Sequence, residues 1–419
     1  MALNGSGPIS LAGATEGESI AVELGESATG TIALNDTIVR DLAEVSSGAI
    51  TMPTDFWGKA STVQGGIWTW GYGAQGQIGD NARVNRSSPV QVGALTDWVD
   101  VAMSSQHTGG IRANGTLWMW GSGYFGQLGI GPNYIYRSSP VQVGALTNWS
   151  QVYTGSQFSA AIKTNGSLYM WGRGTYSRLG NSNIISRSSP VQVGISTDWA
   201  QVSLGFQQSS AIKTDGTLWT WGLGTLGRLG HNDTTDKSSP TQVGALSNWA
   251  QVSTGSRSAA ATKTDGTLWT WGYGQSGRLG LNIDRFINVS SPTQVGALTN
   301  WAQVVSGSNF CIAIKTDGTI WSWGSNGSTA LGIGIGVDVS SPVQIGALTN
   351  WAQPAAGSQN SAAIKTDGTL WTWGNSSGGQ TGQNFRIPNL SSPVQLGAFT
   401  TWGKVSAQFG ADGVIAIKQ

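Results

Sequence analysis

Three short sequence markers recur at a nearly constant spacing along this chain of 419 residues. The dipeptide Trp-Gly starts at Trp70, Trp120, Trp171, Trp221, Trp271, Trp323 and Trp373. Ser-Ser-Pro ends at Pro89, Pro140, Pro190, Pro240, Pro292, Pro342 and Pro393. An isolated tryptophan then follows at Trp98, Trp149, Trp199, Trp249, Trp301, Trp351 and Trp402. Because each marker occurs seven times at intervals of roughly 50 residues, the sequence predicts seven structural repeats.

Each repeat contains four short stretches with the composition of β-strands, which in the fifth repeat read PTQV, WAQVVSG, CIAIK and TIWSW. The last two stretches are joined by Asp-Gly or Asn-Gly, which suits a two-residue hairpin turn. One four-stranded unit cannot bury its tryptophans alone, so neighbouring units must pack against it. The sequence therefore predicts an all-β, seven-bladed β-propeller of four-stranded antiparallel blades over residues 62–419.

The two ends of the repeat region complement each other. Residues 415–419 read IAIKQ and residues 64–71 read QGGIWTWG, and together they make up the segment that is continuous elsewhere, as in AAIKTDGTLWTWG at 362–374. We therefore expect residues 413–418 to pair antiparallel with residues 66–71, so that one blade is shared between the two ends of the domain. Such closure removes free sheet edges.

Positions whose residue differs among the seven copies are not fixed by the packing that all blades share. They are therefore candidates for binding. One set is a pair of residues in the Gly-Ser-x-x motif, before the strand that carries small residues such as Ser-Ala-Ala. We expect that strand to lie nearest the propeller axis and the pairs to rim one mouth of the central channel. The pairs are Gln106-His107, Gln157-Phe158, Gln207-Gln208, Arg257-Ser258, Asn309-Phe310, Gln359-Asn360 and Gln408-Phe409.

A second variable set lies between Trp-Gly and Ser-Ser-Pro and includes Arg86, Tyr134, Tyr136, Arg137 and Arg187. The residue before Ser-Ser-Pro is Arg or Lys in four copies and apolar in the other three, in the order Arg86, Arg137, Arg187, Lys237, Val289, Val339 and Leu390. Amides beside aromatic rings suit a carbohydrate, whereas a rim that is basic on one side and apolar on the other suits a protein or an anionic polymer. Neutral variation of exposed loops is the alternative.

Catalysis finds little support in the sequence. Cys311 is the only cysteine, and His107 and His231 are the only histidines, so no catalytic residues, metal site or cofactor is expected. His107 is interpreted as a hydrogen-bonded structural residue. The basic residue before each hairpin turn is interpreted as a solvated strand end, partly balanced by the acidic residue two positions later, and not as a nucleic-acid platform. A carbohydrate-active enzyme that uses pairs of aspartates stays the weakest option.

The repeats resemble those of the regulator-of-chromosome-condensation family, as WGSGYFGQLGIG at 120–131, WGLGTLGRLGHN at 221–232 and SSPVQVGAL at 138–146 show. The resemblance covers residues 62–419 and implies the propeller fold. Nucleotide exchange on a GTPase, known in that family, would need a wedge-like insertion, and the even repeat spacing leaves no room for one. The tryptophans that a light-sensing member of the family uses are absent from the matching segments, such as SSQHT at 104–108.

Residues 1–61 lie outside the repeats and carry a net charge of −6, whereas the remainder carries +7. This segment is expected to form a separate N-terminal module. Its stretch GTIALNDTIVRDLAEVSSGAITMPTDFWGKAS resembles a module of tail-associated structural proteins of bacteriophages. The resemblance implies attachment to a virion, and the candidate attachment residues are Asp36, Arg40, Asp41, Phe56 and Trp57.

These observations lead to one main hypothesis for function. The chain is expected to be a non-enzymatic virion protein of a phage tail or appendage, made in the host cytoplasm. Residues 1–61 would bind other virion proteins, and the propeller would bind a host surface glycan or protein. The alternative is a soluble scaffold for protein–protein interaction of the regulator-of-chromosome-condensation type. No binding of nucleic acid and no membrane insertion is expected, since no long apolar run occurs.

Overall fold

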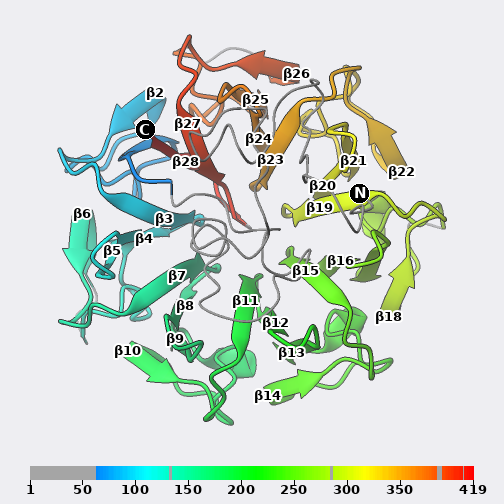
Figure 1. Cartoon of the computed structure of the whole chain (residues 1–419), viewed down its shortest axis with the longest axis horizontal. Helices are drawn as coiled ribbons and strands as arrows, with labels where there is room; N and C mark the ends of the chain where they lie inside the picture. The colour runs from blue at the N-terminus through cyan, green and yellow to red at the C-terminus, as the bar shows by residue number, and fades with distance from the viewer. Residues whose placement is uncertain (1–62, 132–134, 284–285, 385–388, 409) are drawn as a thin grey trace, which may run out of the picture. The chain divides into compact units, whose positions relative to one another are not determined.

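A computed structural model of the chain describes residues 63–131, 135–283, 286–384, 389–408 and 410–419. Within these ranges the strands form seven four-stranded antiparallel sheets, which Figure 1 shows as blades arranged around a central axis. The predicted fold class is thereby confirmed. Blades 1 to 6 each use four consecutive strands, starting with β3, and blade 7 combines the first two strands with the last two.

The strands of each blade are ordered from the axis outwards. The inner strands are β3 (Trp98–Met103), β7 (Trp149–Thr154), β11 (Trp199–Leu204), β15 (Trp249–Thr254), β19 (Trp301–Ser306), β23 (Trp351–Ala356) and β27 (Trp402–Ser406). The second strands are β4 (His107–Arg112), β8 (Phe158–Lys163), β12 (Gln208–Lys213), β16 (Ser258–Lys263), β20 (Phe310–Lys315), β24 (Asn360–Lys365) and β28 (Gly413–Lys418).

The outer half of each blade carries the Trp-Gly and Ser-Ser-Pro markers. The third strands are β5 (Leu117–Ser122), β9 (Leu168–Gly172), β13 (Leu218–Gly222), β17 (Leu268–Gly272), β21 (Ile320–Gly324), β25 (Leu370–Gly374) and β1 (Gly66–Gly71). The outer strands are β6 (Tyr136–Gln142), β10 (Arg187–Gln192), β14 (Lys237–Gln242), β18 (Val289–Gln294), β22 (Val339–Gln344), β26 (Leu390–Gln395) and β2 (Arg86–Gln91). Short 3₁₀ turns follow three third strands: η1 (Thr175–Ser177), η2 (Thr225–Gly227) and η3 (Gln275–Gly277).

The predicted closure of the ring is confirmed. Strands β1 and β28 pair antiparallel, with Gly66 opposite Lys418 and Gly71 opposite Gly413. Strand β28 also pairs with β27, so that blade 7 has the order β2-β1-β28-β27. The first and last described strands are therefore neighbours in one sheet.

The prediction of which strand lies nearest the axis is wrong. The strand with small residues, such as β16 (SAAATK), is the second strand of its blade, and the strand that starts with the isolated tryptophan is the inner one. The axial cavity is lined by residues of β3, β7, β11, β15, β19, β23 and β27. Small residues are needed in the second strand because it is covered on both faces by neighbouring blades.

The hydrophobic core lies between blades. In one cluster Ile212, Leu218 and Val243 of blade 3 pack with Trp249 and Trp271 of blade 4. In blade 4 the isolated Trp249 meets both tryptophans of the third strand edge to face, with ring centroids 6.0 Å from Trp269 and 6.3 Å from Trp271. Such arrangements add to the stabilisation from burial.

Each Trp-Gly tryptophan also bonds to the preceding blade. The indole Nε1 of Trp221 donates to the backbone oxygen of Arg178 at 3.0 Å, and this oxygen belongs to the loop between β9 and β10. The same bond occurs at all seven blade interfaces, with Trp70, Trp120, Trp171, Trp221, Trp271, Trp323 and Trp373 as donors. We call this bond the tryptophan lock.

The Ser-Ser-Pro marker makes a second contact between blades. The backbone oxygen of its first serine accepts a hydrogen bond from the long loop of the preceding blade, as from Ser182 N to Ser238 O at 2.9 Å. The accepting serines are Ser87, Ser138, Ser188, Ser238, Ser290, Ser340 and Ser391. Two of the three sequence markers thus mark the interfaces between blades.

The propeller has two faces that differ in what they carry. On the turn face lie the Asp-Gly and Asn-Gly turns and the connections between blades, and Thr164 N of such a turn bonds Asn148 O of a connection. On the long-loop face lie the loops between third and outer strands and the turns between inner and second strands, and Arg173 N bonds Gln157 O there.

Candidate functional site: the long-loop face

The candidate pairs of the Gly-Ser-x-x motif lie on the long-loop face, but only half of each pair is accessible. The first residues are partly or fully exposed: Gln106, Gln157, Gln207, Arg257, Asn309 and Gln359. The second residues start the second strands and are buried: His107, Phe158, Gln208, Ser258, Phe310 and Asn360. The prediction that both members rim the channel is therefore wrong for the second members, which fill the blade interior.

The seventh pair was aligned wrongly. In the other blades the backbone oxygen of the first residue accepts from the long loop, as Gln207 O does from Leu223 N. In blade 7 the oxygen that accepts this bond, from Tyr72 N, belongs to Asp412. The equivalent pair is therefore Asp412-Gly413, and Gln408 belongs to a longer turn. Its side-chain Oε1 accepts a hydrogen bond from Thr154 N of blade 2 at 2.8 Å.

His107 is held in the interior as a neutral hydrogen-bonded residue. Its Nε2 lies 2.8 Å from Ser159 Oγ, and Ser159 Oγ itself donates to Gln127 O at 2.9 Å. The imidazole therefore donates to the serine and does not take its proton, so this pair is not an activated nucleophile. Burial lowers the pKa of His107 to about 3, against an opposing contribution from its hydrogen bond to the backbone of Phe158.

A cavity of about 370 Å³ lies on the axis and is surrounded by the inner strands of all seven blades. Polar side chains of its wall join adjacent blades: Val152 N donates to Asp100 Oδ2 at 2.7 Å and Val252 N to Gln201 Oε1 at 3.1 Å. Lys404 of blade 7 forms an ion pair with Asp100 of blade 1. Polar side chains of the cavity wall therefore hold adjacent blades together.

The residue before Ser-Ser-Pro has the same backbone position in every blade. It lies opposite the glycine of Trp-Gly, as Arg187 does opposite Gly172 and Val289 opposite Gly272. Basic residues occupy the position in blades 7, 1, 2 and 3, and apolar residues in blades 4, 5 and 6. One side of the ring therefore carries basic side chains and the other carries apolar side chains at the same backbone position, as the sequence predicts.

The basic side of this face also carries aromatic side chains. Arg83 stacks on Tyr136, with the guanidinium carbon 4.3 Å from the ring centroid, and Arg173 stacks on Phe125 at 4.7 Å. Tyr136 and Tyr176 are each 43% exposed. Arginine and tyrosine are over-represented among residues that dominate the energetics of protein interfaces.

Three buried arginines under the long-loop face were missed by sequence reasoning. Arg178, Arg228 and Arg278 occupy equivalent loop positions in blades 2, 3 and 4 and are at most 5% exposed. Burial is the main cause that lowers the pKa of each guanidinium to about 10. The signal was present in the sequence, because Arg-Leu-Gly in these copies replaces Gln-Ile-Gly or Gln-Leu-Gly in the first two.

The apolar side of the long-loop face is formed by the loops of blades 4 and 5. Ile287 and Val337 precede the outer strands β18 and β22, and Ile283 and Ile335 lie in the same two loops. These four side chains are between 37% and 58% exposed. Val84, Ile184 and Ile185 are further exposed apolar groups, in the long loops of blades 7 and 2. Exposed apolar groups that gather on a surface in this way are typical of a contact surface.

The ring of basic residues on the turn face is not a set of solvated strand ends, so that interpretation is wrong. Lys263, Lys315 and Lys365 are buried, and the Nζ of Lys315 lies 3.7 Å from the ring centroid of Trp321 and 4.9 Å from that of Trp301. Burial lowers the pKa of each of these lysines, and the nearby aspartate opposes the shift. The cations stabilise the aromatic clusters by cation–π contact.

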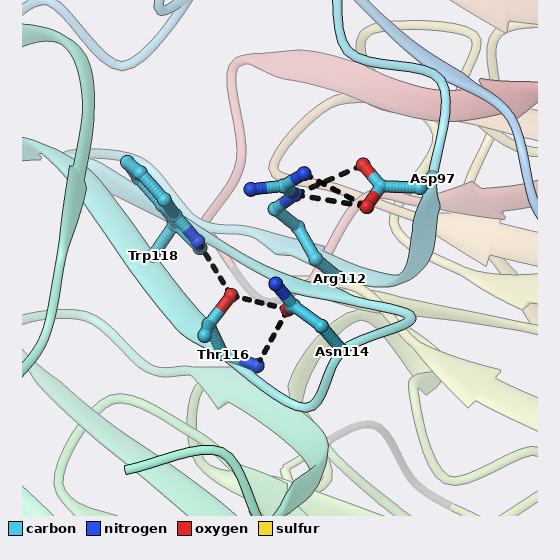
Figure 2. Close-up of polar contacts among 5 residues, drawn as sticks. All are labelled: Asp97, Arg112, Asn114, Thr116 and Trp118. Atoms are coloured by element: carbon cyan, nitrogen blue, oxygen red, sulfur yellow. Dashed lines mark hydrogen bonds and ion pairs between the residues drawn. The ribbon is translucent and has the colours of Figure 1, made fainter. Parts of the chain in front are cut away.

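Blade 1 shows the same arrangement with different residues, drawn in Figure 2. Trp118 Nε1 donates to Thr116 Oγ1, and Thr116 Oγ1 donates to Asn114 Oδ1 at the turn. Arg112 stands where other blades have lysine and makes two hydrogen bonds of 2.9 Å to the carboxylate of Asp97. At this turn, the polar groups of all five residues drawn are therefore bonded to one another.

Some predicted residues lie outside the described ranges. These are Tyr134 and Phe409 on the propeller, and Asp36, Arg40, Asp41, Phe56 and Trp57 of the N-terminal segment. Among the described residues, no group of three or more histidines, cysteines or acidic residues is placed to hold a metal ion. None of the helices in those ranges has the length and apolar character needed to cross a bilayer.

The repeats of this chain match those of a known protein family. The regulator of chromosome condensation (RCC1) repeat matches residues 64–111, 114–162, 165–212, 215–262, 265–314 and 317–364. A second profile of the same repeat matches residues 98–127, 149–178, 301–329 and 353–380. Together these matches cover more than half of the chain.

Two curated proteins show moderate similarity over part of the chain. The human E3 ubiquitin-protein ligase HERC2 is 31% identical over 128 residues, which is 29% of this chain and 3% of that protein. The protein RCC2 homolog of Xenopus laevis is 28% identical over 127 residues, 29% of this chain and 24% of that protein. The matched part is thus a small share of each relative.

Two solved structures share the fold over most of the chain. Human WBSCR16 superposes with a TM-score of 0.75 at 20% identity, covering 85% of this chain and 99% of that one. Prp20p of Saccharomyces cerevisiae, described together with its binding to Gsp1p and histones, gives a TM-score of 0.75 at 20% identity over 86% and 93% of the two chains.

Proposed function

The chain belongs to the family of regulator of chromosome condensation (RCC1) repeat proteins, and we propose that it is a non-catalytic platform that binds a protein partner across its long-loop face. The observation that carries this proposal is the chemistry of the residue before Ser-Ser-Pro, near the start of the outer strand. One backbone frame presents basic side chains in four blades and apolar side chains in three. A partner that contacts both sides is recognised in a single orientation.

The two faces differ in their capacity for such recognition. On the turn face the connections between blades repeat one chemistry at most positions, with Leu95, Leu146, Leu246, Leu298 and Leu348 between 40% and 49% exposed and the exceptions Ser196 and Phe399. A surface that repeats to this extent offers a partner fewer features that fix one orientation. The long loops differ from blade to blade, and specificity in binding depends on such differences.

A protein partner is favoured over a glycan. The aromatic rings that would stack on a sugar beside the rim amides are Phe158 and Phe310, and both are buried in the blades. The exposed arginines and tyrosines suit a protein interface instead. Prp20p, which shares the fold, was described with protein partners, and this supports the same class of partner here.

The hypothesis of a phage virion protein rests on residues 1–61, which lie outside the described ranges. The family matches fall within residues 64–380 and do not bear on that segment. Attachment to a virion and location in a tail or appendage therefore stay predictions. The scaffold, which the sequence offers as the alternative, is the function that the comparisons favour.

Site-specific photo-crosslinking tests the platform. A crosslinking amino acid replaces Ile287 on the long-loop face in one variant of the full chain and Leu246 on the turn face in a matched control of similar exposure. In cells that express the chain, the Ile287 variant should give a discrete protein adduct and the Leu246 variant none. Equal labelling from both faces, or adducts from Leu246 alone, would contradict the proposal.

A further inference from the structure

We propose that the partner presents an acidic segment to the long-loop face, where it lies over an arc of arginines on blades 1 to 4; this inference rests on the proposed platform function. The basic arc consists of four arginines that are exposed or half-buried and three that are buried beneath them. The first group is Arg137, Arg173, Arg187 and Arg257, and the second is Arg178, Arg228 and Arg278.

The outer arginines of the arc lack the carboxylates that equivalent residues have. Arg86 forms an ion pair with Asp80, and Lys237 with Asp233. Arg137 and Arg187, at the same repeat position, form no ion pair with any described residue. The Nε of Arg187 is enclosed and has no hydrogen-bond acceptor among the described residues.

The sequence explains why these two cations are uncompensated. Asp80 directly follows the glycine of the GQIG segment, whereas Ile130 and Asn181 follow the corresponding Gly129 and Gly180. Neither replacement carries a negative charge. The arc therefore has an excess of positive charge where the neighbouring blades have neutral pairs.

The buried arginines add positive charge from below. Their side chains donate to neutral oxygens: Arg178 Nη1 donates to Phe206 O at 3.0 Å, and Arg278 Nη1 donates to Asn309 Oδ1 at 2.8 Å. Both acceptors belong to the turns that rim the channel on the long-loop face. Charges in a partly buried setting are screened by salt less than exposed charges, so their field reaches the surface above them.

Stacking holds two of the four outer guanidiniums, those of Arg173 and Arg257, in place before a partner arrives. Arg173 lies over Phe125 and donates to Gln157 Oε1 at 2.6 Å. The guanidinium carbons of Arg257 and Arg278 lie 5.6 and 5.0 Å from the ring centroid of Tyr273. Side chains that are already ordered lose less conformational entropy when they bind a carboxylate.

The same face favours an acidic protein segment over a nucleic acid. Blades 4 and 5, at one end of the arc, present the exposed apolar residues Ile283, Ile287, Ile335 and Val337. A phosphate backbone is charged along its whole length and gains nothing from these apolar groups. A protein can place carboxylates over the arc and apolar side chains over the loops of blades 4 and 5.

Fluorescence anisotropy with the full chain tests the proposal. The probes are an Asp-rich peptide, its twin with Asn at every Asp position, and a DNA duplex. The Asp-rich peptide should bind more tightly than the other two, and its affinity should fall as salt concentration rises. Arg137→Gln and Arg187→Gln should each weaken this binding roughly two- to fivefold. Thermal melting of each variant verifies that it is folded.

The double variant Asp80→Asn/Arg86→Gln is the matched control, because Arg86 occupies the same repeat position and is paired with Asp80, so that removing both charges leaves the net charge unchanged. It should leave the affinity for the Asp-rich peptide unchanged. The proposal is overturned if this double variant weakens binding as much as Arg137→Gln does, if the Asn twin binds equally well, or if the duplex binds more tightly at the same salt concentration.

The outcome separates this inference from the proposed function. Should Ile287 give a protein adduct while the Asp-rich peptide does not bind, the platform stands and the acidic partner is wrong. Should neither result appear, both fail. Reduced adduct formation in the Arg137→Gln background supports both.

Discussion

Replacing Gly180 by alanine tests whether the tryptophan lock determines the stability of the blade interfaces. Gly180 has a φ of +70°, and an added Cβ would lie 2.7 Å from Nε1 of Trp221. The indole would have to move away from Arg178 O, to which it donates at 3.0 Å. Gly194→Ala is the matched control, since Gly194 has a φ of +62° and an added Cβ would meet nothing within 4 Å.

The two variants share one cost and differ in another. A left-handed backbone costs an alanine about 1–2 kcal/mol in either place. Only Gly180→Ala also disturbs a fully buried indole, and a buried N–H without an acceptor costs about 1–3 kcal/mol. Gly180→Ala should therefore lower the free energy of unfolding by about 2 kcal/mol more than Gly194→Ala.

Urea denaturation followed by tryptophan fluorescence and circular dichroism measures this difference. Gly180→Ala should unfold at a clearly lower urea concentration than Gly194→Ala. If both variants have the same midpoint, the close approach of glycine to the indole does not matter for stability, and the reasoning about the lock is refuted.

Three further predictions concern the interior and the seam of the ring. The pKa of His107 is about 3 in the folded chain and near 6.5 in the unfolded chain. Between these two pH values only the unfolded chain binds the proton. The free energy of unfolding therefore falls by about 1.4 kcal/mol for each unit that the pH drops through this range. His107→Asn, which copies Asn360 of blade 6, should remove this loss, and unfolding at pH 7 and pH 5 measures it; an unchanged pH dependence would show that His107 does not titrate in this way. Gln408→Ala should lower the free energy of unfolding by about 1 kcal/mol because Thr154 N loses its acceptor. Adding Ala102→Ser to this variant should restore part of the loss, since Ser203 is the equivalent acceptor between blades 3 and 4. If the second substitution does not raise the melting temperature, a serine at position 102 does not replace the lost acceptor. Deleting residues 413–419 removes the strand that joins β1 to β27, so the truncated chain should lose its cooperative thermal transition, and retention of the parental melting curve would disprove closure by β28.

Local sequence signals were sufficient for the fold. Asp-Gly and Asn-Gly turns and the alternation of Leu with Trp identify the strands, and the complementarity of residues 64–71 and 415–419 predicts the seam in its observed register. These features are local or strictly periodic, and they do not depend on which element lies beside which.

The order of strands from the axis outwards could not be read in the same way. Both the inner strand WAQVST and the second strand SAAATK carry several small side chains, so either could fit near the axis. Their order depends on how blades wedge together, which is a tertiary property. The contacts of the buried lysines with tryptophan rings were missed for the same reason. Lys315 meets Trp301 and Trp321 only once the hairpin is folded.

The candidate site was predicted in part. Arg137 and Arg187 occupy equivalent backbone positions, as the repeat alignment predicts. Gln408 was misplaced because a shared Gln-Phe dipeptide suggested an alignment with Gln157-Phe158, whereas the hydrogen bond from Tyr72 N shows that the turn in blade 7 is longer. A change of loop length at the seam cannot be told from a substitution when only side-chain identity is compared.

The tryptophan lock also bears on how such a ring changes its size during evolution. Each copy of the repeat brings one indole donor and one carbonyl acceptor, so duplicating an internal unit adds a lock without leaving any group unpaired. The seam behaves differently, because Lys404 with Asp100 and Gln408 with Thr154 occur only there. Gain or loss of a whole internal unit therefore leaves every lock donor with an acceptor, whereas the residues that join the two ends of the ring must be inherited together.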